Sequence, residues 1–174
     1  STGVGCHCLL RILCISYVKQ YDCPVSIVRP GHIYGPTARN ADRRVSSEFM
    51  KLALNKRDIV LKSSGTQIRS YCHCLDCATA ILTVLVKGGN GVAYNISNRN
   101  SIITIYEMAE LIAEYSGIHV KYQLPKDCER NAFNPMQNSS LDSNRIEKLG
   151  WSGMFDAKKG LEHTIDVLRE LNND

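Results

Sequence analysis

The sequence predicts an α/β fold, and a few simple observations support that prediction. Short runs rich in β-branched residues alternate along the chain with longer segments whose apolar residues recur at helical spacing. Hydrophobic residues make up 44% of the 174 residues and charged residues 22%, which is enough apolar material for a core. The chain has no internal repeat and no low-complexity segment. Alternating strands and helices are typical of a layered α/β structure.

Helix signals occur at several places. They are residues 9–21, a segment from a Ser46 or Ser47 cap through Lys56, residues 76–87, a segment from Thr104 to Gly117, a short one from a cap at Asp142 to Gly150, and one that begins at a cap on Asp156. The clearest is the capping box of Thr104 and Glu107, in which each side chain accepts from the other residue's amide. The residues behind this box predict a buried stripe of Ile105, Met108, Ala109, Ile112 and Tyr115.

Strand signals fall between these helices. They are residues 24–28, 59–61, 68–73, 93–96 and 120–122. The first is short and rich in β-branched residues, so we expect it to be buried on both faces of a parallel sheet. Residues 124–140 show neither pattern, and an irregular segment is expected there.

Charge and cysteine usage exclude several classes of protein. The net charge of +4 is spread over the chain, which favours an anionic small ligand over nucleic acid. No apolar run approaches the roughly 18 residues that a membrane span needs, and the first residues lack the pattern of a signal peptide. The eight cysteines have no regular spacing, which indicates reduced thiols. We therefore expect a cytoplasmic protein with no membrane or nucleic-acid partner.

The stretch from Tyr71 to Cys77, YCHCLDC, contains residue types that bind zinc. A structural zinc site needs about four converging ligands, usually from two separate turns, and no second cluster lies near this one in sequence. The alternative is a junction between a strand and a helix. In it Asp76 caps the helix, and Cys72, Cys74 and Cys77 act as small apolar residues. We favour this structural interpretation and expect no metal.

Short motifs in a fixed order carry a resemblance to a known family. They are Arg29–Pro36, Arg44–Phe49, Gly65–Tyr71, Asp76, Tyr94–Ser97 and Leu149–Trp151. Together they closely resemble the C-terminal half of the NAD-dependent epimerase/dehydratase enzymes, which are extended short-chain dehydrogenases that act on nucleotide sugars. The spacing between the second and third motifs is most similar to the UDP-glucuronate decarboxylase branch.

The resemblance implies the C-terminal part of an extended Rossmann-type fold, with an incomplete parallel sheet and a small substrate-binding α/β subdomain. On this basis residues 1–174 form a single partial domain. Residues 1–36 and 75–100 would be the remnant of the Rossmann sheet and its helices. Residues 37–74 and 101–174 would form the substrate-binding subdomain.

The same resemblance implies a ligand site. In the family, the loop of the first motif passes between cofactor and sugar, so we expect His32 at the substrate and the backbone of Gly31 and Ile33 beside the nicotinamide. Arg44 resembles an arginine near the bound ligands, and Arg69 resembles one that reaches the substrate diphosphate. Guanidinium groups match phosphate oxygens and keep their charge at any working pH. The plain alternatives are a loop histidine and two solvated surface arginines.

Residues 1–11 depart from the family. Its members carry a catalytic YxxxK on the helix before the first motif, in which the tyrosine is the acid/base and the lysine lowers its pKa. Gly3 stands at the tyrosine position and His7 at the lysine position, and neither can do this chemistry. The sequence also lacks a glycine-rich turn after a strand, which receives the NAD pyrophosphate. NAD is the family's cofactor, but we expect no catalytic residue and no bound NAD in this chain alone.

The leading hypothesis is a truncated member of the family that keeps part of a site for a UDP-type nucleotide sugar without the chemistry. One alternative is a non-catalytic nucleotide-sugar-binding or regulatory subunit, and the other is a small zinc-binding protein. Because strand 24–28 would lose neighbouring strands, we also expect a homo-oligomer, formed through an exposed sheet edge or through the first helix.

Overall fold

The computed structural model describes residues 2–37, 41–123 and 136–173, and it confirms an α/β structure. The helices are α1 (Thr2–Tyr21), α2 (Val45–Leu54), α3 (Cys74–Lys87), α4 (Ile105–Ser116), α6 (Asn144–Glu147) and α7 (Ala157–Asn173). The strands are β1 (Ile27–Pro30), β2 (His32–Tyr34), β3 (Ile59–Leu61), β4 (Ile68–His73), β5 (Ala93–Ile96), β6 (Ile102–Thr104) and β7 (Val120–Tyr122). A 3-10 turn, η1 (Arg99–Ser101), precedes β6. No helix in this described part is long and apolar enough to cross a membrane.

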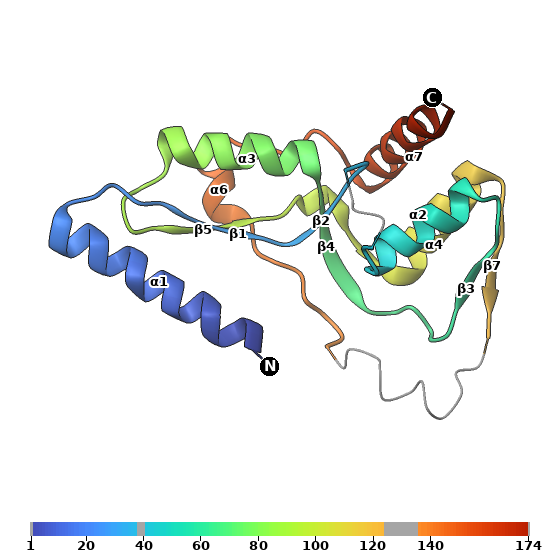
Figure 1. Cartoon of the computed structure of the whole chain (residues 1–174), viewed down its shortest axis with the longest axis horizontal. Helices are drawn as coiled ribbons and strands as arrows, with labels where there is room; N and C mark the ends of the chain where they lie inside the picture. The colour runs from blue at the N-terminus through green and yellow to red at the C-terminus, as the bar shows by residue number, and fades with distance from the viewer. Residues whose placement is uncertain (1, 38–40, 124–135, 174) are drawn as a thin grey trace.

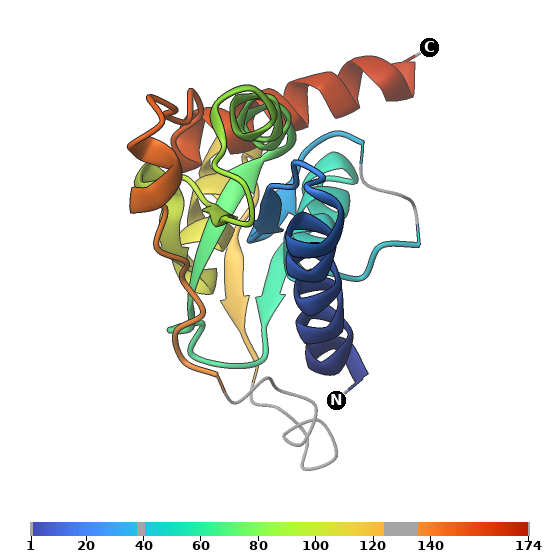
Figure 2. The ribbon, with the colours of Figure 1, turned by 90° about the vertical axis from the view of Figure 1, so that its left-hand side faces the viewer.

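The strands pair mostly in parallel, as an α/β fold requires. β1 pairs with β5, β2 with β4 and β3 with β7 in parallel, while β6 runs antiparallel along β4. At one end of the molecule α1 and α3 lie on opposite sides of the β1/β5 pair, and at the other end β3 and β7 lie beside α2 and α4 (Figure 1). The turned view shows β3 and β7 side by side (Figure 2).

The core consists of two apolar clusters. The larger one lies between α2, α4, α7 and β3 and includes Met50, Ile59, Met108, Ile112, Leu161 and Ile165. The smaller one lies under α3 and includes Cys72, Ala80, Val84, Ile96, Ile146 and Trp151. The larger cluster also forms one side of a cavity, so the packing of three helices holds that side in place.

The first strand differs from the prediction. β1 begins at Ile27 instead of residue 24, and its residues are half-buried or exposed, so the prediction of burial on both faces is wrong. The cause is the pairing: among the described strands, β1 has β5 as its only neighbour. The strands predicted at 59–61, 68–73, 93–96 and 120–122 lie at those residues, whereas β2 and β6 were not predicted. The predicted first helix extends from Tyr21 back to Thr2. Most of the predicted irregular segment, 124–135, falls outside the described residues.

The predicted capping box of α4 is confirmed. Glu107 N donates to Thr104 Oγ1 at 3.0 Å, and Thr104 N donates to Glu107 Oε2 at 2.7 Å. The stripe behind it is buried at Met108, Ala109 and Ile112. Ile105 is only half-buried, and Tyr115 has 36% of its surface exposed, because its hydroxyl donates to Asp166 of α7 near the surface.

The predicted serine cap of α2 is wrong. The cap position is Arg44, whose side chain makes no hydrogen bond to the first turn. The Ser47 hydroxyl instead donates to Asp42 Oδ2 at 2.8 Å, and Ser46 lies within the helix. The first turn of α2 therefore begins without a side-chain cap.

Asp76 does not cap α3, which corrects a second prediction. The cap is His73, whose Nδ1 accepts from the amide of Leu75. The Asp76 carboxylate is fully buried and accepts from the amides of Met154 and Phe155 at 2.8 and 3.2 Å. Asp76 thus fastens the start of α3 to the loop before α7.

The two remaining aspartate caps fare differently. Asp156 Oδ1 accepts from Lys159 N at 2.8 Å, so the predicted cap of α7 is confirmed. The cap position of α6 is Ser143, one residue later than predicted, while Asp142 Oδ1 accepts from the amide of Asn144.

Candidate anion-binding site

A cavity of about 510 Å³ brings together most of the residues predicted to contact ligands. His32 and Ile33 of β2, Arg44 at the start of α2 and Arg69 of β4 all line it. The parallel register of β2 and β4, which places His32 opposite Tyr71, explains how residues far apart in sequence meet here. We call this space the arginine cavity.

The charged side chains that line the arginine cavity are basic. They are Arg43, Arg44, Lys62 and Arg69, and among the described lining residues there is no aspartate or glutamate. Ser46 and Val45, in the uncapped first turn of α2, lie in the same wall. The positive end of the α2 dipole therefore adds to the field of the side chains.

Arg69 is the most informative of these residues. Its side chain is buried, with 6% exposed, and its Nη1 donates to the carbonyl of Ile68 at 2.8 Å. Within residues 2–37, 41–123 and 136–173 no carboxylate forms an ion pair with it. A buried charge is costly unless it is paired and hydrogen-bonded. The structure therefore holds a guanidinium at the cavity that an anion would neutralise.

Arg44 is held differently. Its Nε donates to Asp42 Oδ2 at 2.9 Å, its Nη2 also contacts Asp42, and its Nη1 donates to the carbonyl of Ile33 at 2.8 Å. The Arg44 guanidinium holds the pKa of the Asp42 carboxyl well below its usual range. Asp42 thus neutralises part of the Arg44 charge and fixes the guanidinium against the β2 backbone.

The two arginines affect the protonation of His32. Burial lowers the pKa of His32 from 6.5, and the positive charges of Arg69 and Arg44 lower it further. The ring is therefore neutral near pH 7. Its Nδ1 has no hydrogen-bond partner among the described residues, and its ring meets that of Tyr71 edge to face at 5.7 Å. A neutral imidazole with an unpaired nitrogen suits a contact to a hydroxyl group.

The rest of the wall is apolar or aromatic, and the sequence did not predict it. Phe49, Val60, Tyr71 and Ile105 contribute to it. Val60 projects from β3 and is 41% exposed between two buried neighbours, Ile59 and Leu61. Side chains alternate between the two faces of a strand, so Val60 must point away from the core that holds Ile59 and Leu61. This alternation is the one sequence signal that could have placed Val60 at the cavity.

The other predicted site residues lie elsewhere. Gly31 does not line the arginine cavity, and its amide donates to the carbonyl of Ile96 in β5 at 2.9 Å. Gly3 and His7, at the family's tyrosine and lysine positions, lie in α1. The structure thus brings His32, Ile33, Arg44 and Arg69 together and places the remaining positions apart from them.

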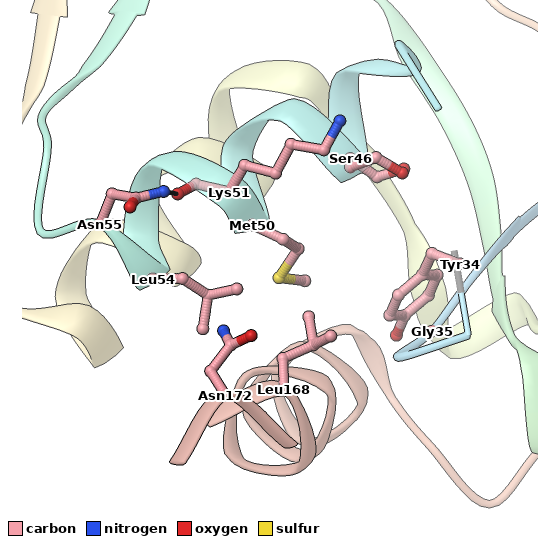
Figure 3. Close-up of a pocket in the computed structure, with 10 residues that line it drawn as sticks. Tyr34, Gly35, Ser46, Met50, Lys51, Leu54, Asn55, Leu168 and Asn172 are labelled. Atoms are coloured by element: carbon pink, nitrogen blue, oxygen red, sulfur yellow. Dashed lines mark hydrogen bonds between the residues drawn. The ribbon is translucent and has the colours of Figure 1, made fainter. Parts of the chain in front are cut away.

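A second cavity, of about 560 Å³, lies between α2 and α7. Met50 and Leu54 of α2 face Leu168 and Asn172 of α7 across it (Figure 3). Lys51 is its one basic lining residue, and its ammonium donates to the carbonyl of Asp42. This space lacks the buried, unneutralised charge of the arginine cavity and is the weaker candidate for an anion.

The described residues contain neither a glycine-rich turn between a strand and a helix nor a cluster of metal-binding side chains. The starts of α3 and α4 are closed by their own caps, and none of the described helices follows a glycine-rich turn after a strand. There is accordingly no cradle for the NAD pyrophosphate in this part of the chain. Within the same residues, the histidine, cysteine and acidic side chains form no group of three that could hold a metal, and this includes the stretch from Tyr71 to Cys77.

Comparison with known proteins places this site in context. The family model for the NAD dependent epimerase/dehydratase family matches residues 7–97. Human dTDP-D-glucose 4,6-dehydratase is 29% identical over 172 residues, which are 98% of this chain and 47% of that protein. UDP-glucuronic acid decarboxylase 3 of Arabidopsis thaliana is 28% identical over 149 residues, 86% of this chain and 42% of that protein. Dehydratases and a decarboxylase therefore match about equally well.

Solved structures show the same fold. The crystal structure of UDP-glucose 4-epimerase from Thermotoga maritima with UDP-glucose superposes with a TM-score of 0.79 at 20% identity, over 93% of this chain and 51% of that one. The chain spans about half the length of these relatives. Its fold is the corresponding part of a Rossmann-type epimerase/dehydratase. On the family match, which covers just over half of its residues, the chain belongs to the NAD-dependent epimerase/dehydratase family.

Proposed function

We propose that this chain forms the nucleotide-sugar-binding part of an epimerase/dehydratase, with Arg69 as the ligand of the diphosphate. The observation that carries the proposal is the buried Arg69 guanidinium, which lines a cavity without acidic residues and has no carboxylate partner among the described residues. The Thermotoga maritima relative was solved with UDP-glucose, and a Bacillus cereus relative with UDP-glucuronic acid and NAD. These ligands support a UDP-type nucleotide sugar here.

The cavity suits the parts of such a ligand. Arg69, Arg44 and the start of α2 supply positive charge for a diphosphate, because guanidinium forks and helix amides both bind phosphate oxygens. Phe49 and Val60 supply apolar surface for a base or the face of a sugar. His32 supplies a neutral ring nitrogen for a sugar hydroxyl. The volume of about 510 Å³ lies in the usual range for small-molecule sites.

The proposed activity of these residues is binding without hydride transfer. Gly3 offers no proton at the position of the family tyrosine, and the described residues hold no dinucleotide cradle. NAD and an acid/base would have to come from another stretch of polypeptide. In one version of this proposal, binding is the whole function. The chain would then be a nucleotide-sugar-binding or regulatory subunit that docks on such a polypeptide.

We further propose that the chain associates with a second copy of itself in the cytoplasm. Apolar side chains on α1 are exposed, among them Leu10, Ile12, Leu13, Tyr17 and Tyr21. β1 has an unpaired edge among the described strands. Exposed apolar surface and a free strand edge both favour association. The free thiols of Cys72 and Cys77 are those expected of a reducing compartment.

Calorimetric titration with UDP and UDP-glucuronate tests the binding proposal. We expect measurable heat and saturation with the unmodified chain, and a loss of affinity of about 10- to 100-fold in Arg69→Ala, since hydrogen bonds to charged groups contribute about 1.5–3 kcal/mol. Arg57→Ala is the matched control, because Arg57 is exposed and does not line the cavity. Equal affinity in both variants, or no heat with either ligand, would contradict the proposal.

A further inference from the structure

Cys74 and Cys77 form a C-x-x-C pair in the first turn of α3. Neither side chain contributes to the arginine cavity, and both thiols are free. Cys74 is half-buried, whereas Cys77 has 8% of its surface exposed and Cys72, on the adjoining strand, has none. A pair of cysteines in a helical first turn, one more accessible than the other, is an arrangement found in thiol redox proteins.

The spacing of the pair permits a disulfide. Residues three apart on a helix lie on the same face, with Cβ atoms about 5–6 Å apart. A disulfide needs Cβ atoms about 3.5–4.5 Å apart, so the first turn must tighten by an ångström or two. The first turn is also the part of a helix whose amides lack intrahelical partners, so tightening it breaks few hydrogen bonds.

We propose that Cys74 and Cys77 are a redox-active dithiol that closes reversibly to an intramolecular disulfide. With a peroxide as oxidant, the Cys74 thiolate attacks one peroxide oxygen and the O–O bond breaks. The other oxygen leaves as water or an alcohol after taking a proton, and Cys74 becomes a sulfenic acid. The Cys77 thiol then attacks that sulfur, the S–O bond breaks, and water leaves with the Cys77 proton. A dithiol reductant reverses the change by thiol–disulfide exchange.

The order of these steps follows from accessibility. Cys74 is the first to react because it is the more exposed residue of the pair. Burial raises the pKa of the Cys77 thiol and, more strongly, that of Cys72. Both buried thiols are therefore protonated near pH 7, and the thiolate is the species that reacts. Cys77 acts second, once the sulfenic acid has formed beside it.

The position of Cys74 connects the dithiol to the strand that carries His32. A Cβ added at Gly35 would lie 2.4 Å from Cys74 Sγ, so the sulfur rests directly on the Gly35 backbone. Gly35 immediately follows β2, which holds His32 and Ile33 at the arginine cavity. Turning Cys74 Sγ toward Cys77 removes this contact at the end of β2.

Peptide mass mapping of the full chain tests the proposal. The protein is equilibrated in glutathione buffers of increasing oxidised fraction, and in parallel with one equivalent of hydrogen peroxide, then alkylated and digested with trypsin. Cleavage after Arg69 and Lys87 releases residues 70–87, which contain Cys72, Cys74 and Cys77. After alkylation we expect the oxidised peptide to carry one alkyl group and to lack two hydrogen atoms, and the peptide from protein first treated with dithiothreitol to carry three alkyl groups. Fragmentation of the unmodified chain's peptide should place the link between Cys74 and Cys77.

Variants separate the proposed pair from other oxidation. Cys72→Ala should still form the link, whereas Cys74→Ser and Cys77→Ser should not. The proposal is overturned if residues 70–87 stay reduced while other cysteines of the chain oxidise. It is equally overturned if Cys74 gives only a sulfenic acid or a glutathione adduct, or if fragmentation links Cys72 to Cys77.

Discussion

The two terminal helices, α1 and α7, differ in what covers them. On α7 the apolar side chains of Leu161 and Ile165 face a core and are almost completely buried. On α1 the apolar side chains Leu10, Ile12 and Leu13 are more than half exposed. In Figure 1 α7 lies beside α2 and α4, whereas α1 lies alone beneath the β1/β5 pair. The comparison teaches that this chain covers the apolar face of α7 with its own core, while the apolar side chains of α1 stay exposed within the described residues.

The largest expected effect on stability comes from removing the Asp76 hydrogen bonds that hold the loop before α7. Asp76→Ala removes the fully buried acceptor of the Met154 and Phe155 amides and of Asn98 Nδ2, which keeps the Phe155 carbonyl as a second acceptor. We expect a loss of about 2–6 kcal/mol in the free energy of unfolding, because two amides lose their acceptor and each buried polar group left unpaired costs about 1–3 kcal/mol. Urea unfolding measures it. A loss near 1 kcal/mol, typical of a helix cap alone, would restore the simpler role for Asp76.

A matched pair of truncations sharpens the contrast between the helices. Ile165→Ala in α7 should lower the free energy of unfolding by about 2–5 kcal/mol, because it leaves a cavity in the larger apolar cluster. Leu13→Ala in α1, at a side chain 53% exposed, should change it by about 0.5 kcal/mol or less in monomeric protein. Chemical denaturation of both variants at the same concentration provides the measurement. Equal losses would show that α1 belongs to the same cooperative core.

Much of the fold was predictable because local rules and tertiary packing agree. The capping box of Thr104 and Glu107 and the strands at 59–61, 68–73, 93–96 and 120–122 lie where the sequence indicates. The errors fall where a side chain has a distant partner. Ser47 bonds to Asp42 and Asp76 bonds to amides near residue 154, and neither partner can be found from helix-cap rules.

Acid should destabilise the packing around His73, next to the start of α7. His73 packs against Phe155 and His163, and the buried groups around it also include Tyr34 and Asp76. Burial and then the charge of His163 lower the pKa of His73 to about 4. The unfolded chain therefore binds more protons between about pH 6.5 and 4, so stability present near neutral pH is lost as the pH falls through this range.

The size of the acid effect follows from the difference between the two pKa values. From pH 7 to 4.5 we expect His73 to account for a loss of about 2–3 kcal/mol in unfolding free energy. His73→Asn is the control, since asparagine can still accept from the Leu75 amide but does not titrate. If unfolding free energies of the two proteins fall in parallel over this range, His73 is not the group responsible.

The smallest effect on stability and the clearest effect on assembly are expected on α1. A double variant, Leu13→Lys with Tyr17→Lys, should leave unfolding nearly unchanged but lower the mass seen by light scattering at micromolar concentration to that of a monomer. Val86→Lys on α3, at a side chain 79% exposed, is the matched control for apolar surface elsewhere. If the unmodified chain is already a compact monomer, α1 needs another explanation. If Val86→Lys alone dissociates it, α3 is the contact.

The site was less predictable than the fold. His32, Arg44 and Arg69 could be chosen from the resemblance, because short motifs mark them, and the structure brings them to one cavity. The sequence could not tell that Arg69 is buried with no carboxylate partner in the described part of the chain, while Arg44 is bound to Asp42 two positions away. That difference depends on the pairing of β2 with β4 and on the loop before α2. The spacing of residues along the sequence predicts neither of them.

A thermodynamic cycle tests the central claim, that the Arg69 guanidinium binds the diphosphate. The affinities of UDP and uridine are measured for the unmodified chain and for Arg69→Ala by calorimetry. If Arg69 contacts the diphosphate, removing either group should abolish much the same interaction. The two changes should then be coupled by about 1.5–3 kcal/mol. Coupling indistinguishable from zero, with UDP and uridine losing the same affinity in Arg69→Ala, would contradict the account.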